Sequence, residues 1–85
     1  MVRSKKYASS SKIKRGSWWV LDHERGRIII KVVGTTHKEV HYRFKTHIDL
    51  GYTRGKPNYL CKRRFTDFYR PLTSLEAFLE GLNDL

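Results

Sequence analysis

The sequence has 85 residues, of which 18 are lysine or arginine and 8 are aspartate or glutamate, so its formal net charge is +10. A chain of this length forms one small domain, and no apolar run approaches the roughly 20 residues that a membrane-spanning helix needs. The single cysteine, Cys61, excludes an intramolecular disulfide, and without a hydrophobic N-terminal segment we expect a cytoplasmic or nucleoid-associated protein.

The charge is unevenly distributed along the chain. Residues 1–70 contain every lysine and arginine against five acids, whereas residues 71–85 contain three acids and no base. A strongly basic body attracts polyanions, and nucleic acid is the usual one. A solvated surface that serves only solubility is the alternative interpretation.

Residues 1–15 are predicted to form a disordered basic arm. The segment holds six basic residues and four serines and has little that a core could bury. Burial of so few apolar groups does not offset the entropy lost on ordering. Such an arm either extends along a nucleic acid or is a plain solvated tail.

Three strands are predicted next. Residues 17–22 are aromatic and β-branched and lead into a turn that ends at Gly26, and residues 27–33 are β-branched almost throughout. Residues 39–44 alternate, with Val40, Tyr42 and Phe44 on one side and the polar residues on the other. This alternation is the clearest strand signal in the chain.

The segment 45–57 contains two glycines and a proline and is predicted to be a long loop. Residues 58–65 are predicted to resume as a strand, and residues 66–70 to form a turn or a single 3₁₀ turn. From these assignments we expect the core to include Tyr59, Cys61, Phe65, Phe68 and Tyr69.

One helix is predicted, from Thr73 to about Gly81 or Asn83. Thr73 and Glu76 have the spacing of a capping box. Four apolar residues then follow at positions i, i+3, i+4 and i+7, which is the spacing of a single helical stripe: Leu75, Phe78, Leu79 and Leu82.

These elements predict a mostly β fold with one C-terminal helix. The simplest arrangement is a small, strongly bent antiparallel sheet, an SH3-like barrel of four or five strands over residues 16–72. Residues 73–85 would then form a capping helix packed on the barrel. An open sheet of three or four strands packed on the helix is the competing arrangement.

The order of several motifs resembles the small SH3- or Tudor-like barrel proteins, in particular phage and prophage proteins of unknown function. The motifs are Gly16-x-Trp18-Trp19, the β-branched strand, Val40-x-Tyr42, Phe65 and Phe68-Tyr69. The resemblance covers residues 16–70 and implies a binding module rather than an enzyme. It implies no particular ligand, because one fold serves many partners.

Nucleic acid, either DNA or RNA, is the partner that the basic residues predict. Cations on strand faces and in the long loop would contact phosphates, the N-terminal arm would extend the contact, and Tyr52 would stack on an unpaired base. The predicted contact residues are Arg27, Lys31, Arg43, Lys45, Tyr52, Arg54, Lys56, Lys62, Arg63 and Arg64. Because the predicted helix is acidic, we do not expect a recognition helix in a major groove.

Other kinds of site find little support. The four histidines and Cys61 lack the spacing of metal ligands, and no nucleophile–base pair or carboxylate cluster is evident, so we expect no metal, cofactor, small-molecule substrate or enzymatic activity. The alternative function is a phage-type effector that binds a host protein or nucleoprotein complex. Its interface would include Trp18 and Trp19, of which a regular strand buries only one.

Overall fold

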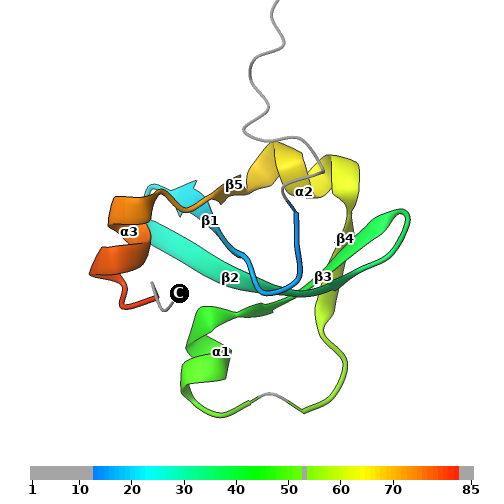
Figure 1. Ribbon diagram of the computed structural model, residues 1–85, viewed down its shortest axis with the longest axis horizontal. Helices are drawn as coiled ribbons and strands as arrows, with labels where there is room; N and C mark the ends of the chain where they lie inside the picture. The colour runs from blue at the N-terminus through cyan, green and yellow to red at the C-terminus, as the bar shows by residue number, and fades with distance from the viewer. Residues whose placement is uncertain (1–12, 53, 83–85) are drawn as a thin grey trace, which may run out of the picture.

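The computed structural model describes residues 13–52 and 54–82, so residues 1–12 of the arm expected at residues 1–15 lie outside the described part. Five strands form one antiparallel sheet in the order β4-β3-β2-β1-β5 (Figure 1). The strands are β1 (Trp18–His23), β2 (Gly26–Thr35), β3 (Glu39–Phe44), β4 (Asn58–Cys61) and β5 (Arg70–Pro71). The described helices are α1 (Lys45–Asp49), α2 (Lys62–Phe68) and α3 (Ser74–Leu79).

The sheet confirms the mostly β prediction, but it is not closed. Strand β5 returns to pair with β1, where Trp19 lies opposite Pro71, and β4 pairs only with β3. Strands β4 and β5 therefore form the two edges of an open sheet. The barrel remains unconfirmed.

The central strands β1, β2 and β3 agree with the sequence prediction. Their register places Trp19, Ile30 and Phe44 in one row and Val32 opposite Tyr42, so these side chains share the inner face of the sheet. Trp19, Ile30 and Val32 are fully or almost fully buried there, together with Val40 and Tyr42. As predicted from the alternation, one tryptophan of the Trp18–Trp19 pair is buried in the core.

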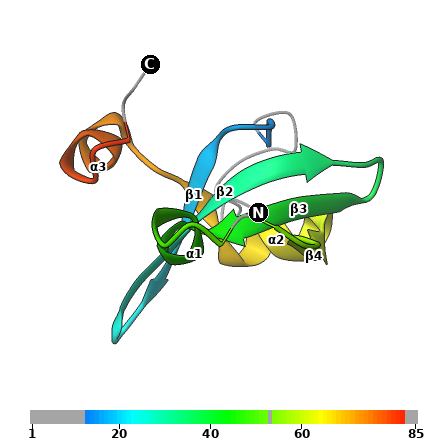
Figure 2. The same cartoon turned by 90° about the horizontal axis from the view of Figure 1, so that it is seen from below.

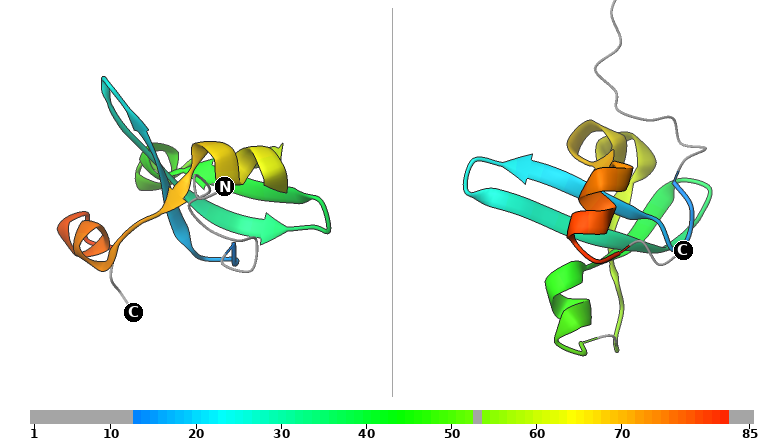
Figure 3. Two further views of the ribbon diagram at one scale, coloured as in Figure 1. Left: turned by 90° about the horizontal axis from the view of Figure 1, so that it is seen from above. Right: turned by 60° about the vertical axis from the view of Figure 1, so that its left-hand side comes forward.

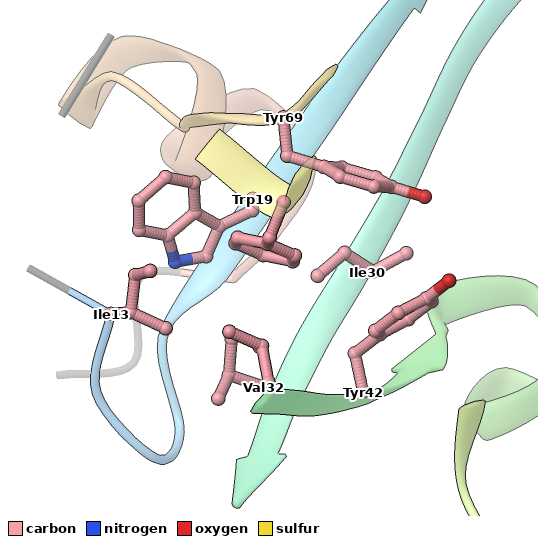
Figure 4. Packing of buried hydrophobic residues seen from close by; sticks show 8 residues of the cluster. Ile13, Trp19, Ile30, Val32, Tyr42 and Tyr69 are labelled. Carbon is pink, nitrogen blue, oxygen red and sulfur yellow. The ribbon is translucent and has the colours of Figure 1, made fainter. Parts of the chain in front are cut away.

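Helix α2 covers this inner face, and here the sequence prediction was wrong. Residues 62–65 do not continue strand β4; they begin a helix in which Phe65 and Thr66 are buried, and Tyr69, which caps its C-terminus, is buried as well. The Phe65 ring lies 5.0 Å from the Trp19 ring and 4.9 Å from the Tyr69 ring, measured between centroids. Figure 4 shows Tyr69 over the same sheet face as Trp19 and Ile30. The helix is favoured because it directs Phe65 and Tyr69, four residues apart, to one side.

The same error changes the composition of the core. Tyr59 and Cys61 lie on the outer face of β4 and are exposed, and Phe68 is exposed on the far side of α2. The two core residues that we predicted correctly in this segment are Phe65 and Tyr69.

Residues 13–17 are ordered against the sheet, although the sequence placed residues 13–15 in the basic arm. The Gly16 N–H donates to the Val32 carbonyl at 2.7 Å, and the Val32 N–H donates to the Ser17 carbonyl at 2.9 Å. Gly16 has φ +90, a left-handed conformation that glycine adopts without strain. This turn brings Ile13 into the core beside Trp19 (Figure 4).

Helix α3 begins at the expected capping box but is shorter than predicted and stands away from the core (Figures 2 and 3). We expected its apolar stripe to pack on the barrel. Instead, Leu75, Phe78 and Leu79 are each at least 65 % exposed. Ionic contacts hold α3 in place. Arg70 on β5 donates to Glu76 at 2.7 Å and to Asp22 at 2.8 Å, and Arg27 lies 3.5 Å from Glu76. The short linker after β5 leaves the stripe outside the sheet.

The ion cluster makes stability depend on pH. Hydrogen bonds from Arg70 and from the Thr73 N–H lower the pKa of Glu76 from 4.5 to about 2. A lowered folded-state pKa means that the contribution is complete above pH 4.5 and is lost as pH falls toward 2. We expect Glu76→Gln to cost about 1 kcal/mol at neutral pH.

Urea unfolding of the wild type and Glu76→Gln between pH 2 and pH 7 tests this expectation. The difference in unfolding free energy should vanish near the low end of that range. Glu80→Gln removes a carboxylate from the end of the same helix and serves as the control, with little effect at any pH. A Glu76→Gln difference that persists unchanged at low pH would contradict the assignment.

Candidate nucleic-acid interface

The outer face of the sheet combines cations with aromatic rings. Trp18 lies opposite Lys31, and Lys31 lies opposite Arg43, so the three side chains form one row across β1, β2 and β3. The Lys31 Nζ is 5.3 Å from the centre of the Trp18 ring, a cation–π distance. In the next outer row, His41 and Tyr59 stack with their rings 5.8 Å apart.

A hollow lies at the end of this face, where β3 meets α1 and the segment leading to β4. Its volume is about 240 Å³. The lining residues are Arg43, His47, Tyr52, Arg54, Lys56, Pro57 and Asn58. Arg43 is held in place there, because its Nη2 donates to the Gly55 carbonyl at 2.7 Å. The segment 45–57, which was predicted to be a loop throughout, begins with the helix α1, and it contributes several side chains to a single site.

A second hollow, of about 340 Å³, adjoins the first and shares Arg43 with it. Its lining includes Arg15, Lys31 and Ile48. No lining residue of either hollow is acidic, within the part of the chain that the structure describes. We call the five cations of these hollows the outer basic surface: Arg15, Lys31, Arg43, Arg54 and Lys56.

The predicted contact residues do not all belong to this surface. Four of its five cations were predicted: Lys31, Arg43, Arg54 and Lys56. The predicted Tyr52 lines the same hollow as Arg43, Arg54 and Lys56, and all of these residues come from two strands and one connecting segment. Among the described residues, no ion pair joins the cations of this surface to a carboxylate, although Arg43 bonds the Gly55 carbonyl.

Two other predicted contact residues are engaged by carboxylates of the chain itself. Arg27 lies 3.8 Å from Asp22 and 3.5 Å from Glu76. Lys45 donates to Asp49 at 2.7 Å within α1. Binding a phosphate at either residue would require it to leave these partners.

The remaining three, Lys62, Arg63 and Arg64, form a separate patch on α2. We expected them on a strand near the other cations, but they occupy the first turn of the helix that covers the inner face. This also corrects the expectation that no helix carries basic residues. Arg63 and Arg64 are exposed, so α2 offers a second, smaller cationic surface.

Sequence reasoning missed Arg15, His47 and Tyr59 as members of this face. Arg15 was assigned to the arm, and only the adjacent Gly16 hinted at a turn that returns the chain to the sheet. His41 had been placed on the correct strand face, opposite Val40 and Tyr42. Tyr59 was assigned to the wrong face because strand β4 was taken to be longer than it is.

Comparison with known proteins adds no assignment. No family model, curated protein or solved structure matches the chain.

Within residues 13–52 and 54–82, no helix is long and apolar enough to cross a membrane. The same residues contain no group of three or more His, Cys, Asp and Glu side chains placed to hold a metal ion.

The structure alters the alternative protein interface, which was expected to include Trp18 and Trp19. Trp19 is 1 % exposed, so it is unable to contact a partner. Trp18 is half-buried on the outer face beneath Lys31, so it adjoins the outer basic surface and does not form a separate patch.

Proposed function

We propose that this protein binds nucleic acid, with the outer basic surface on the phosphate backbone. One observation carries the proposal: five cations from separate segments gather on one face, and no carboxylate among the described residues pairs with them. Like charges held together repel one another, and a polyanion relieves that repulsion and releases its own counterions.

The fold proposed to present this surface is an opened SH3-like barrel. The return of β5 to pair with β1, after a helix that covers the inner face, supports that description. Such a sheet leaves the part of its outer face that carries the two hollows, together with the segment 45–57, open to a ligand. The exposed Cys61 thiol fits the reducing compartments in which nucleic acid is found.

Fluorescence anisotropy of labelled DNA and RNA at several salt concentrations tests the proposal. Each phosphate contact contributes about 0.7 to 0.9 to the salt slope, so five contacts predict a slope of log K against log salt near −4. We expect micromolar or tighter binding at low salt. Equal, weak binding with a slope shallower than about −1 would reject the function and leave the protein-binding alternative.

A further inference from the structure

The hollow at the end of β3 is too small to enclose a whole drug-sized ligand, which needs roughly 300 Å³ or more. Its volume of about 240 Å³ suits one flat group that belongs to a longer molecule. Three cations line it, so the attached parts of that molecule are expected to be anionic. A nucleotide within a strand has this combination of flat base and charged backbone.

Tyr52 lines the hollow, and this residue is 65 % exposed. A single exposed aromatic needs no functional explanation by itself. This one, however, is held in place: its N–H donates to the His47 carbonyl at 2.8 Å, and its ring lies 6.1 Å from the His47 ring. Gly51, with φ +87, makes the turn that brings Tyr52 back against α1. The ring is presented to solvent by a defined backbone.

Arg43 also lines the hollow, and its guanidinium is fixed by its hydrogen bond to the Gly55 carbonyl. Arginine guanidinium planes and tyrosine rings are the two kinds of surface on which unpaired bases stack. Both line this one hollow. Arg54 and Lys56 beside them supply charge for the adjoining phosphates.

Further aromatic groups continue the pattern along the outer face. The stacked pair His41 and Tyr59 begins two residues along β3 from Arg43, about 7 Å away at the usual strand rise. Trp18 lies on the other side, across Lys31. Aromatic groups thus alternate with cations along the face, which is how single-strand binders are built. In a duplex the faces of the bases are covered by their neighbours.

We infer that the ligand is single-stranded nucleic acid, with one unpaired base held at the hollow by Tyr52 and Arg43. The inference rests on the proposed function and specifies its substrate. Duplex binding through the exposed cations of α2 is the competing outcome, because a basic helix is the element that enters a major groove.

Anisotropy titrations with oligothymidylate and with a duplex of equal length, at equal salt, test the inference. The wild type should bind the single strand at least about tenfold more tightly. Loss of one base–aromatic stack should make Tyr52→Leu about 5- to 100-fold weaker on the single strand, with the salt slope unchanged. Arg43→Lys keeps the positive charge but loses the planar guanidinium, so it should also weaken binding to the single strand.

Phe78→Leu is the matched control. Phe78 on α3 is an aromatic residue as exposed as Tyr52, but it is remote from this site in sequence and lines neither hollow. It should leave both affinities unchanged, and circular dichroism should show all three variants folded. Equal affinity for duplex and single strand, with no effect of Tyr52→Leu, would overturn the inference and leave the proposed function standing. Failure to bind either nucleic acid would instead overturn the proposed function.

Discussion

Phe65→Ala is expected to remove a large part of the stability of this fold. Phe65 has no exposed surface, and its ring contacts Trp19, Tyr69 and, with centroids 6.1 Å apart, Tyr42. Truncation to alanine would leave a cavity between α2 and the sheet, and such changes cost about 3–5 kcal/mol. A domain of this size has roughly 4–13 kcal/mol in total.

Phe68→Ala provides the matched control for this measurement. Phe68 lies on the same helix, three residues on, but its side chain is half-exposed. The same chemical change there should cost less than about 1 kcal/mol. Urea unfolding followed by tryptophan fluorescence gives both values. Similar midpoints for the two variants would show that Phe65 is not the centre of the core.

The sequence was informative where the hydrophobic pattern alone decides the structure. In β3, the alternation of Val40, Tyr42 and Phe44 with polar residues has one explanation, a strand with one buried face, and the structure agrees. The β-branched residues of β2 and the aromatic pair at the start of β1 were equally clear. Local preference and tertiary packing agree in these three strands.

The prediction failed where two local patterns compete. In residues 58–69, a short apolar alternation runs directly into a segment in which Phe65 and Tyr69 are four residues apart. A longer strand satisfies the first pattern, and a helix satisfies the second. Packing of Phe65 and Tyr69 against Trp19 selects the helix, and this long-range contact is not visible in the local sequence.

The candidate site was predictable only as a list of residue types. The sequence identified cations and Tyr52 in the segment 45–57. It gave no sign that Arg43, on strand β3, would donate a hydrogen bond to the Gly55 carbonyl in that segment. Nor did it show that Asp22 and Glu76 would occupy Arg27. Which cations are free for a ligand depends on contacts between residues far apart in the chain.

The division of the cations between two surfaces leads to the second large prediction. A variant with Lys31, Arg54 and Lys56 replaced by alanine removes charge from the outer basic surface without touching the core. Because three phosphate contacts are lost, the slope of log K against log salt for the single strand should become shallower by about 2. At about 0.1 M salt, the corresponding loss of affinity is about 100-fold.

The triple variant Lys62/Arg63/Arg64→Ala changes the net charge by the same amount on the opposite layer of the molecule. If the outer face is the binding surface, this variant loses only the long-range attraction, a few-fold at most, because about 10 Å of salt solution screens distant charges. Titrations of both variants across a range of salt concentrations compare the two layers directly. A larger loss in the α2 variant would move the interface to that helix, and equal losses would mean that total charge rather than a defined surface attracts the ligand.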